Sequence, residues 1–337
     1  MPSFIHPGTL WRDTRGHRIR AHSAGILTIN ATFGSAPLFV WYGADHYRQP
    51  NHTKDHNHEP PNRKINAYSS RDLTNWEPHG TVFEMACEAL NIAHGCYVDR
   101  PKVLATSTNR YVMWLKSTPF VAVATSGSPF GPFKLRGRWK PGGLDVGDIG
   151  ACYDGSTRRS FLAYSVKPSS TPNATRVVHI ARLDEPDLTN ISEVVSTIPF
   201  AREAPAPFAP TGAGRYFVWT SRPSGWYPNA AELFSAPSMR GPWKSEGNPT
   251  RSPDSFSSQV SFILPLPRTR HSFVYVADRF APWINTSESG RYVWLPAELV
   301  ANASRGGSPS SPVVRIVWRD HWKVPRVGSV IESGFSG

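Results

Sequence analysis

The chain has 337 residues, of which 39% are hydrophobic and 12% aromatic, so it is long enough for one large domain or two smaller ones. No stretch reaches the roughly 18 consecutive apolar residues that a membrane-spanning helix needs, so no membrane partner is expected. The net charge of +12 is compatible with binding to nucleic acid or to an acidic polysaccharide. Lys and Arg are scattered along the chain, however, which favours a solvated basic surface and no nucleic-acid binding.

Five short runs rich in aromatic and β-branched residues recur along the chain, and each predicts a buried strand. In chain order they are PLFVWYG (37–43), RYVMWLKS (110–117), RSFLAYSV (159–166), RYFVWTSR (215–222) and HSFVYVADR (271–279). A second kind of run combines a short alternating strand, a polar turn and a closing Trp, Phe or Leu. Its examples are INAYSSRDLTNWE (65–77), AVATSGSPFGPFK (122–134), HIARLDEPDLTN (179–190) and ELFSAPSMRGPWK (232–244).

A strand, a turn and an aromatic plug that recur at this spacing are typical of a propeller blade, a small antiparallel sheet that packs against its neighbours. A β-sandwich also uses short strands and turns, but it lacks a repeat of blade size. The sequence therefore predicts an all-β fold, a five-bladed β-propeller, as a single domain over residues 1–337. No separate carbohydrate-binding module is expected. The Gly/Ser/Pro patch at 303–312 is interpreted as a loop before a last strand, VVRIVWRDHW.

Glycosylation sequons and cysteines bear on the compartment. Three cysteines cannot all pair within one chain, although Cys87 and Cys96 could bridge a small loop and leave Cys152 over. No apolar segment of a signal peptide follows Met1, which would imply a truncated start. The sequence nevertheless predicts a secreted glycoprotein, because six Asn-x-Ser/Thr triplets occur. They begin at Asn30, Asn51, Asn173, Asn190, Asn285 and Asn302.

Carboxylates beside the strand-like segments are the first candidates for catalysis: Asp99, Asp148, Glu203 and Asp278. Innermost propeller strands line a central funnel, so a catalytic set should supply about one residue per blade. Glycoside hydrolysis fits this arrangement, because it needs an acid and a second group that directs water. An arginine neighbours three of these carboxylates in sequence, so local ion pairs are an alternative explanation for any one of them. Local pairing explains less well why they fall in successive units.

Motifs along nearly the whole chain resemble glycoside hydrolase family 43, and most closely its subfamily 24, the exo-β-1,3-galactanases. They are RDTRGHRIRAHSAGI, FVWYG, AYSSRDLTNW, DRPKV, YVMW, AVATSGSPFGPF, REAPAPF, SGWYPNA, FSSQVSFILPLP, ADRF and RYVWLP. The resemblance implies a five-bladed propeller and an inverting hydrolase that releases galactose from the non-reducing ends of β-1,3-galactan. The implied partner is thus a polysaccharide such as arabinogalactan, and the chain is expected to act as a monomer.

The resemblance assigns catalytic roles residue by residue. Glu203 in REAPA matches the general acid, and Asp148 in GDIG matches the aspartate that tunes this acid. Gln259 in SSQVSF matches a glutamine that takes the place of a carboxylate base. Burial among Ala, Pro and Phe neighbours would raise the pKa of Glu203, and an amide can hold a water although it accepts a proton poorly.

Four further residues are assigned to the sugar site. Asp99 in DRPKV stands where the subfamily usually carries Glu, and Trp226 and Asn229 lie in the SGWYPNA loop. Trp226 could equally be a core aromatic. His22 lies in the stretch 20–27, where arabinofuranosidase and xylosidase relatives carry an aspartate base and this chain has none.

Two departures keep alternatives open, because Ala44 replaces a pocket glutamate and Asp99 is one methylene shorter than Glu. Another family 43 activity, α-L-arabinofuranosidase or β-xylosidase, is one alternative. A catalytically weakened propeller that only binds glycans is another. The sequence shows no convincing metal-ligand set, and no cofactor is expected.

Overall fold

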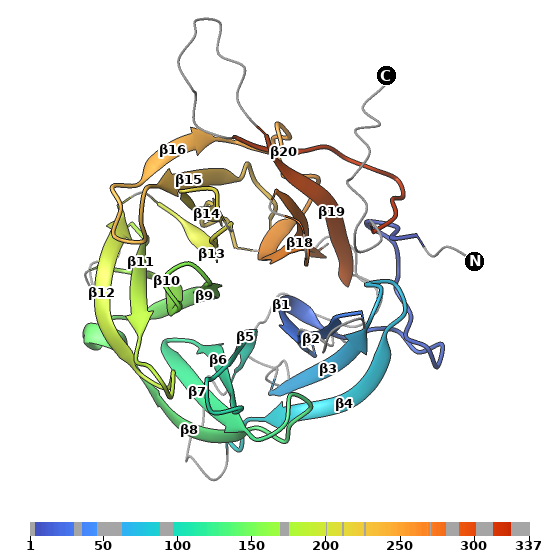
Figure 1. The fold of residues 1–337 in the computed structure, drawn as a ribbon, viewed down its shortest axis with the longest axis horizontal. Helices are drawn as coiled ribbons and strands as arrows, with labels where there is room; N and C mark the ends of the chain where they lie inside the picture. The colour runs from blue at the N-terminus through green and yellow to red at the C-terminus, as the bar shows by residue number, and fades with distance from the viewer. Residues whose placement is uncertain are drawn as a thin grey trace, which may run out of the picture.

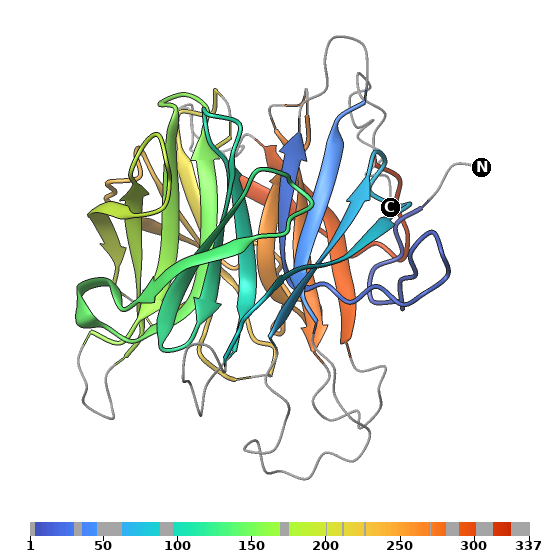
Figure 2. The ribbon, with the colours of Figure 1, turned by 90° about the horizontal axis from the view of Figure 1, so that it is seen from below.

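The structure, a computed structural model, describes residues 4–29, 36–45, 63–87, 97–168, 175–199, 201–210, 212–225, 227–267, 269, 271–280, 290–300 and 313–324. Within these ranges, five four-stranded antiparallel sheets stand around one axis (Figure 1). Seen from the side, the sheets lie next to one another as blades (Figure 2). The predicted five-bladed β-propeller is therefore confirmed, and a β-sandwich is excluded.

Each blade uses four consecutive strands, and the first strand of each lies nearest the axis (Figure 1). Blade I comprises β1 (His22–Ile29), β2 (Leu38–Ala44), β3 (Lys64–Ser70) and β4 (Glu77–Glu84). Blade II comprises β5 (Asp99–Ala105), β6 (Tyr111–Ser117), β7 (Phe120–Ser126) and β8 (Lys134–Trp139). A 3-10 turn, η1 (Pro141–Gly143), precedes blade III, which comprises β9 (Val146–Asp154), β10 (Arg159–Val166), β11 (Val177–Leu183) and β12 (Ile191–Ile198).

Blade IV comprises β13 (Glu203–Phe208), β14 (Tyr216–Ser221), β15 (Glu232–Ala236) and β16 (Lys244–Gly247). Blade V comprises β17 (Gln259–Pro265), β18 (Ser272–Phe280), β19 (Gly290–Val300) and β20 (Val313–Ile316). No helix in the described ranges has the length and apolar character that crossing a bilayer requires.

The five aromatic runs form the second strand of each blade, namely β2, β6, β10, β14 and β18. Second strands lie inside a sheet and are covered on both faces by neighbouring blades, which explains their aromatic and β-branched content. Each carries an aromatic side chain that is at most 1% exposed. These side chains are Trp41, Trp114, Tyr164, Trp219 and Tyr275. The second kind of run forms the third strand and the turn that follows it.

Every inner strand carries the same bulge against its second strand. At this bulge the inner strand advances by three residues while the second strand advances by two. In blade I, for example, His22 pairs with Ala44 and Gly25 pairs with Tyr42. The equivalent pairs begin at Asp99–Lys116, Val146–Val166, Glu203–Ser221 and Gln259–Asp278. The residue after His22, Asp99 and Glu203 has a positive φ, between 49° and 57°. Such bulges re-aim side chains, here at one end of the inner strands.

Neighbouring inner strands approach so closely that glycine is required at the contact. A Cβ on Gly25 would lie 2.1 Å from the carbonyl oxygen of Pro101, and one on Gly150 would lie 2.0 Å from that of Pro205. The fully buried Lys102 joins the same contact, because its ammonium donates to the carbonyl oxygens of Ser23 and Ala24. Blades I and II, and blades III and IV, are thus in backbone contact near the axis.

The two ends of the described chain meet and close the ring between blades V and I. Ile5 and Trp322 exchange backbone hydrogen bonds of 2.9 and 3.0 Å. The Trp322 indole also donates to the carbonyl of Trp294 at 2.8 Å. Trp322 belongs to one buried cluster with residues of the N-terminal segment, blade I and blade V.

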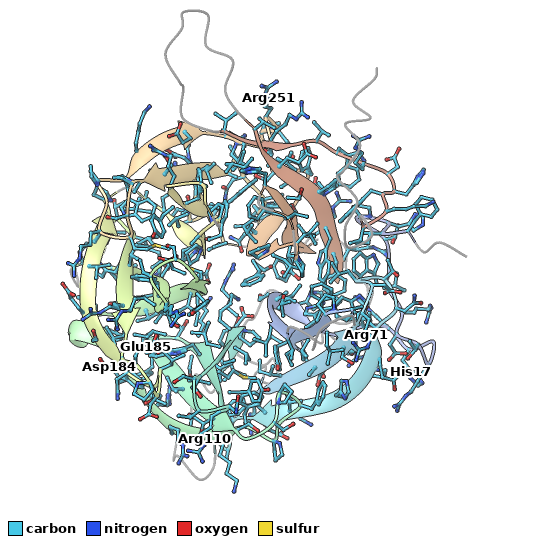
Figure 3. All side chains as sticks on the ribbon, in the orientation of Figure 1. His17, Arg71, Arg110, Asp184, Glu185 and Arg251 are labelled. Atoms are coloured by element: carbon cyan, nitrogen blue, oxygen red, sulfur yellow. The ribbon has the colours of Figure 1, made fainter. Side chains whose placement is uncertain are left out.

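Charged side chains lie mainly on the outside of the ring. Arg71, Arg110 and Arg251, for example, are exposed and belong to three separate blades or their loops (Figure 3). This distribution agrees with the scattered basic residues of the sequence and with a solvated surface.

Candidate active site

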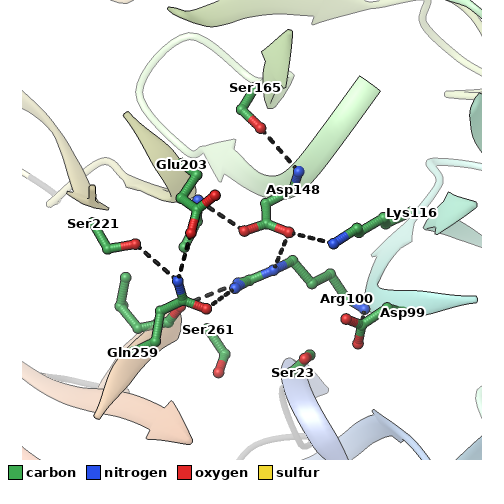
Figure 4. Close-up of polar contacts among 12 residues, drawn as sticks. Ser23, Asp99, Arg100, Lys116, Asp148, Ser165, Glu203, Ser221, Gln259 and Ser261 are labelled. Carbon is green, nitrogen blue, oxygen red and sulfur yellow. Dashed lines mark hydrogen bonds and ion pairs between the residues drawn. The ribbon is translucent and has the colours of Figure 1, made fainter. Parts of the chain in front are cut away.

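Glu203, Asp148, Gln259 and Asp99 converge at the bulged ends of four inner strands (Figure 4). Glu203, Gln259 and Asp99 each begin a strand, and Asp148 lies inside the bulge of β9. Residues separated widely in sequence meet here because the bulge recurs at the same level in each blade.

Gln259 connects the acid candidate with a cation. Its amide nitrogen donates to Oε1 of Glu203 at 3.2 Å and to Oγ of Ser221 at 2.9 Å. Its carbonyl oxygen accepts from Nη2 of Arg100 at 2.6 Å. The amide is therefore oriented, with both N–H groups used and one lone pair of the oxygen left for a further donor.

Asp148 is held by two cations from blade II. Its Oδ1 lies 3.0 Å from Nε of Arg100 and 2.7 Å from Nζ of Lys116, and its Oδ2 accepts from the amide of Ala204 at 3.1 Å. Burial alone would raise the pKa of Asp148, but Arg100 and Lys116 outweigh it and hold that pKa below its ordinary value. Asp148 therefore stays negatively charged. The backbone amide of Ala204 holds its carboxylate next to Glu203.

Glu203 has the properties of a proton donor at neutral pH. Burial in the first place, and the charge of Asp148 in the second, raise the pKa of Glu203 to about 7. Its side chain is only half-buried, so a ligand can reach it. The expectation of a raised pKa from apolar surroundings and a neighbouring carboxylate agrees with these two causes.

Asp99 uses both carboxylate oxygens inside the protein. Oδ2 accepts from the Tyr97 hydroxyl at 2.6 Å, and Oδ1 accepts from the amide of Arg100 at 2.8 Å. With 4% of its surface exposed, Asp99 supports the bulge of β5. A direct contact between Asp99 and the sugar remains a prediction.

His22 lies at the equivalent place in blade I, but it is buried. Its Nδ1 is 3.1 Å from Oδ1 of Asp278, and its ring stacks on Tyr292 with 4.9 Å between centroids. Oδ2 of Asp278 accepts from the Ser23 amide at 2.9 Å and from the Ser261 hydroxyl. This cluster joins blades V and I, and a contact of His22 with the sugar also remains a prediction.

Asn229 forms its hydrogen bonds within its own loop. Its side chain accepts from the amide of Arg222 at 2.9 Å and donates to the carbonyl of Arg222 at 2.8 Å and to the hydroxyl of Ser224. In this structure Asn229 therefore shapes the loop, and Trp226, which the same loop carries, lies outside the described residues.

Two arginines next to site carboxylates in sequence pair instead with other carboxylates, one in the neighbouring blade and one within blade IV. Arg100 follows Asp99 in sequence, yet its guanidinium pairs with Asp148 of blade III, and Arg202, which precedes Glu203, pairs with Glu232. The alternative of purely local ion pairs therefore does not describe these arginines.

Several site residues were not identified from the sequence, namely Arg100, Lys116, Ser165 and Ser221. Lys116 and Ser221 pair with Asp99 and Glu203 across the sheet, and Ser165 accepts from the Asp148 amide at 2.9 Å. The signal that could have found three of them is their common place near the end of the repeated aromatic run. No signal in the sequence marks Arg100, which looked like a local partner of Asp99.

The arrangement can hold a protonated carboxyl beside an oriented amide, with a permanent negative charge behind the acid. This combination suits proton donation to a leaving oxygen. Within the described residues, no group of three or more His, Cys, Asp or Glu side chains gathers as a metal site would require.

Comparison with solved structures gives a consistent answer. An exo-β-1,3-galactanase from Phanerochaete chrysosporium, bound to β-1,3-galactotriose, is 30% identical with a TM-score of 0.76, over 97% of this chain and 70% of that one. A family 43 β-1,3-galactosidase with galactodeoxynojirimycin is 27% identical, with a TM-score of 0.75, over 95% of this chain and 100% of that one.

An exo-β-1,3-galactanase from Clostridium thermocellum is 26% identical with a TM-score of 0.76, over 95% of this chain and 66% of that one. No protein-family model and no curated protein sequence matches the chain.

Proposed function

Since this chain belongs to glycoside hydrolase family 43, we propose that it releases galactose from the non-reducing ends of β-1,3-galactan with inversion at the anomeric carbon. One observation carries the proposal: Glu203, with its raised pKa, lies in hydrogen-bond contact with Gln259, which Arg100 links to Asp148. Solved relatives that are 27–31% identical to this chain are exo-β-1,3-galactanases and a β-1,3-galactosidase, in structures with β-1,3-galactotriose, galactose or galactodeoxynojirimycin.

Glu203 protonates the glycosidic oxygen in this mechanism, and Asp148 keeps the acid protonated until the sugar is bound. Gln259 positions the attacking water through the remaining lone pair of its carbonyl oxygen. A leaving oxygen, an anomeric carbon and a water do not fit between two atoms 3.2 Å apart, since inverting enzymes separate their two groups by about 6.5–9.5 Å. Turnover therefore requires the hydrogen bond between Gln259 and Glu203 to open.

The experiment is incubation with β-1,3-galactan, arabinan and xylan, followed by identification of the released monosaccharide. Galactose from galactan alone is expected. Arabinose or xylose would instead assign one of the other family 43 activities. Binding of galactan without any release would show a propeller that only binds glycans.

Proton NMR of the first product distinguishes the two stereochemical courses. An inverting enzyme gives α-galactose first from a β-linked chain, and a first product of β-galactose would contradict the mechanism. The spectrum must be recorded before mutarotation equilibrates the anomers.

We also propose that the protein is a secreted, glycosylated monomer. Cys87 is disulfide-bonded, which is typical of an oxidising compartment, and Cys152 is free; Cys96 lies outside the described residues. Among the sequons, Asn190 lies in the described part of the chain and is exposed. A mass decrease after glycosidase treatment of protein from a secretory host, together with a monomeric mass in solution, would support the proposal.

A further inference from the structure

A groove of ≈ 280 Å³ lies on the outside of the ring, away from the candidate active site. One wall is the end of β8 with η1, and the other is the beginning of β12, the outer strands of blades II and III (Figure 1). Trp139 forms part of the first wall, while Tyr164 and His179 line the groove between the walls. Val194 on β12 is 47% exposed, unusual for a large apolar side chain on this protein.

The aromatic lining is held in place by the surrounding core. Trp139 packs edge-on against the buried Trp114, with 5.7 Å between centroids, and Tyr164 packs edge-on against His179 at 5.6 Å. Nδ1 of His179 lies 2.8 Å from the Thr197 hydroxyl, which fixes the ring. A preformed apolar groove with a few polar groups is the usual form of a saccharide or small-molecule site.

Asn190, the first residue of an Asn-Ile-Ser sequon, is itself part of the groove wall. It is exposed, and its carbonyl accepts from the amide of Asp184 at 3.0 Å, which fixes the turn before β12. The Ser192 hydroxyl accepts from Nε of Arg182 at 3.0 Å. The sequon therefore lies at the surface, and its asparagine is one of the residues that line the groove.

We propose that Asn190 carries an N-linked glycan and that the groove binds the first sugars of this glycan. Attachment forms a bond from Nδ2 of Asn190 to the anomeric carbon of a lipid-linked oligosaccharyl diphosphate; the diphosphate leaves and the amide loses a proton. The N-acetylglucosamine that results has an apolar C–H face and a methyl group that suit Trp139 and Val194. The inference rests on passage through the secretory route and is independent of the catalytic mechanism.

A tethered sugar needs little intrinsic affinity to occupy this groove. Covalent attachment at the wall gives an effective concentration in the millimolar range, whereas a free saccharide would have to bind the groove through its own contacts alone. Because the attachment point, Asn190, is itself part of the lining, the chain's own glycan is favoured over a soluble ligand as the occupant of the groove.

The test compares the full-length protein with Asn190→Gln, both from a eukaryotic secretory host. Mass spectrometry of the peptide that contains Asn190 gives the occupancy. Hydrogen exchange of the backbone amides at 139–144 shows whether a bound sugar shields the groove wall from solvent. Exchange is expected to be several-fold slower in the glycosylated protein than in Asn190→Gln. Ser192→Thr is the matched control, because it keeps the sequon and the hydroxyl and should leave both readouts unchanged.

A second comparison uses thermal unfolding in two backgrounds. Loss of the glycan should lower Tm by on the order of 1–2 °C in the otherwise unchanged protein and by less when Trp139→Ala is present. An unoccupied Asn190, or equal exchange at 139–144 with and without the glycan, would overturn the proposal. Protection of 139–144 in Asn190→Gln by added β-1,3-galacto-oligosaccharide, without protection by the native glycan, would instead assign the groove to substrate.

Discussion

Glu203 is the residue whose substitution tests the mechanism most directly. Glu203→Gln keeps the shape and can still accept the hydrogen bond from Gln259, but it cannot donate a proton to the leaving oxygen. We expect kcat on β-1,3-galactan to fall by about 10²- to 10⁴-fold or more. Near-normal turnover, measured with unchanged Tm, would show that another residue is the acid.

Asp148 is expected to set the alkaline limit of activity. The active form of Glu203 is protonated, so kcat/KM should fall as pH rises through its pKa, about 7. Asp148→Asn removes a negative charge and leaves Arg100 and Lys116 uncompensated, which lowers the pKa of Glu203. The alkaline limb of the kcat/KM profile should move to lower pH; a move to higher pH would disprove the assigned coupling.

Gln259→Glu should shift the same limb in the opposite direction. The substitution replaces an N–H donor to Glu203 by a second carboxylate at hydrogen-bond distance, and two such groups cannot both ionise easily. The pKa of the carboxyl that keeps its proton therefore rises, and activity should persist to higher pH than in the unchanged enzyme. The measurement is the pH profile of kcat/KM, with Tm recorded to exclude unfolding.

Much of this site could be predicted from single residues, and part of it could not. Glu203, Asp148 and Gln259 were identified because short motifs around them resemble a family. Lys116 and Ser221 were missed because their role depends on the residue opposite them in the sheet, which the sequence does not display. Arg100 was missed because its guanidinium reaches past its own neighbour Asp99 to the adjacent blade.

At the scale of the strand, the contacts between inner strands leave no room for a side chain. Gly150→Ala would place a Cβ 2.0 Å from the carbonyl oxygen of Pro205, so backbone of blade III or IV must move. We expect a loss of stability of about 1–3 kcal/mol. Gly127→Ala is the matched control, since no atom lies within 4 Å of its Cβ, and thermal unfolding should distinguish the two.

The second strands were predictable because burial on both faces requires an uninterrupted apolar run, which is visible in sequence. The inner strands were harder to recognise. They contain prolines and charged residues, as in β5 and β13, or glycines, as in β1 and β9, because they form a bulge and approach another backbone. Their composition reflects the site and the close contacts, so a search for β-rich runs passes over them.

At the scale of the whole molecule, closure of the ring depends on a few residues near its ends. Trp322→Ala removes a buried indole, its hydrogen bond to Trp294, and packing shared by blades I and V. Removal of a buried Trp costs about 3–5 kcal/mol, so a clear decrease in Tm is expected. Trp318→Ala is the control, because Trp318 is 37% exposed, and an equal effect of both would argue against a closure role.

The bulge that recurs in all five blades also defines equivalent positions, so the residues of the site can be compared from one blade to the next. His22, Asp99, Val146, Glu203 and Gln259 occupy the same pairing position in successive copies of one unit. Five different side chains at one repeated position are what divergence after duplication of an ancestral blade would produce. Blade III has an apolar residue there and offers Asp148 two residues later, where its carboxylate accepts from the amide of Ala204. The carboxylate of blade III thus lies two residues beyond the repeated position, which brings it next to the backbone of the acid in blade IV.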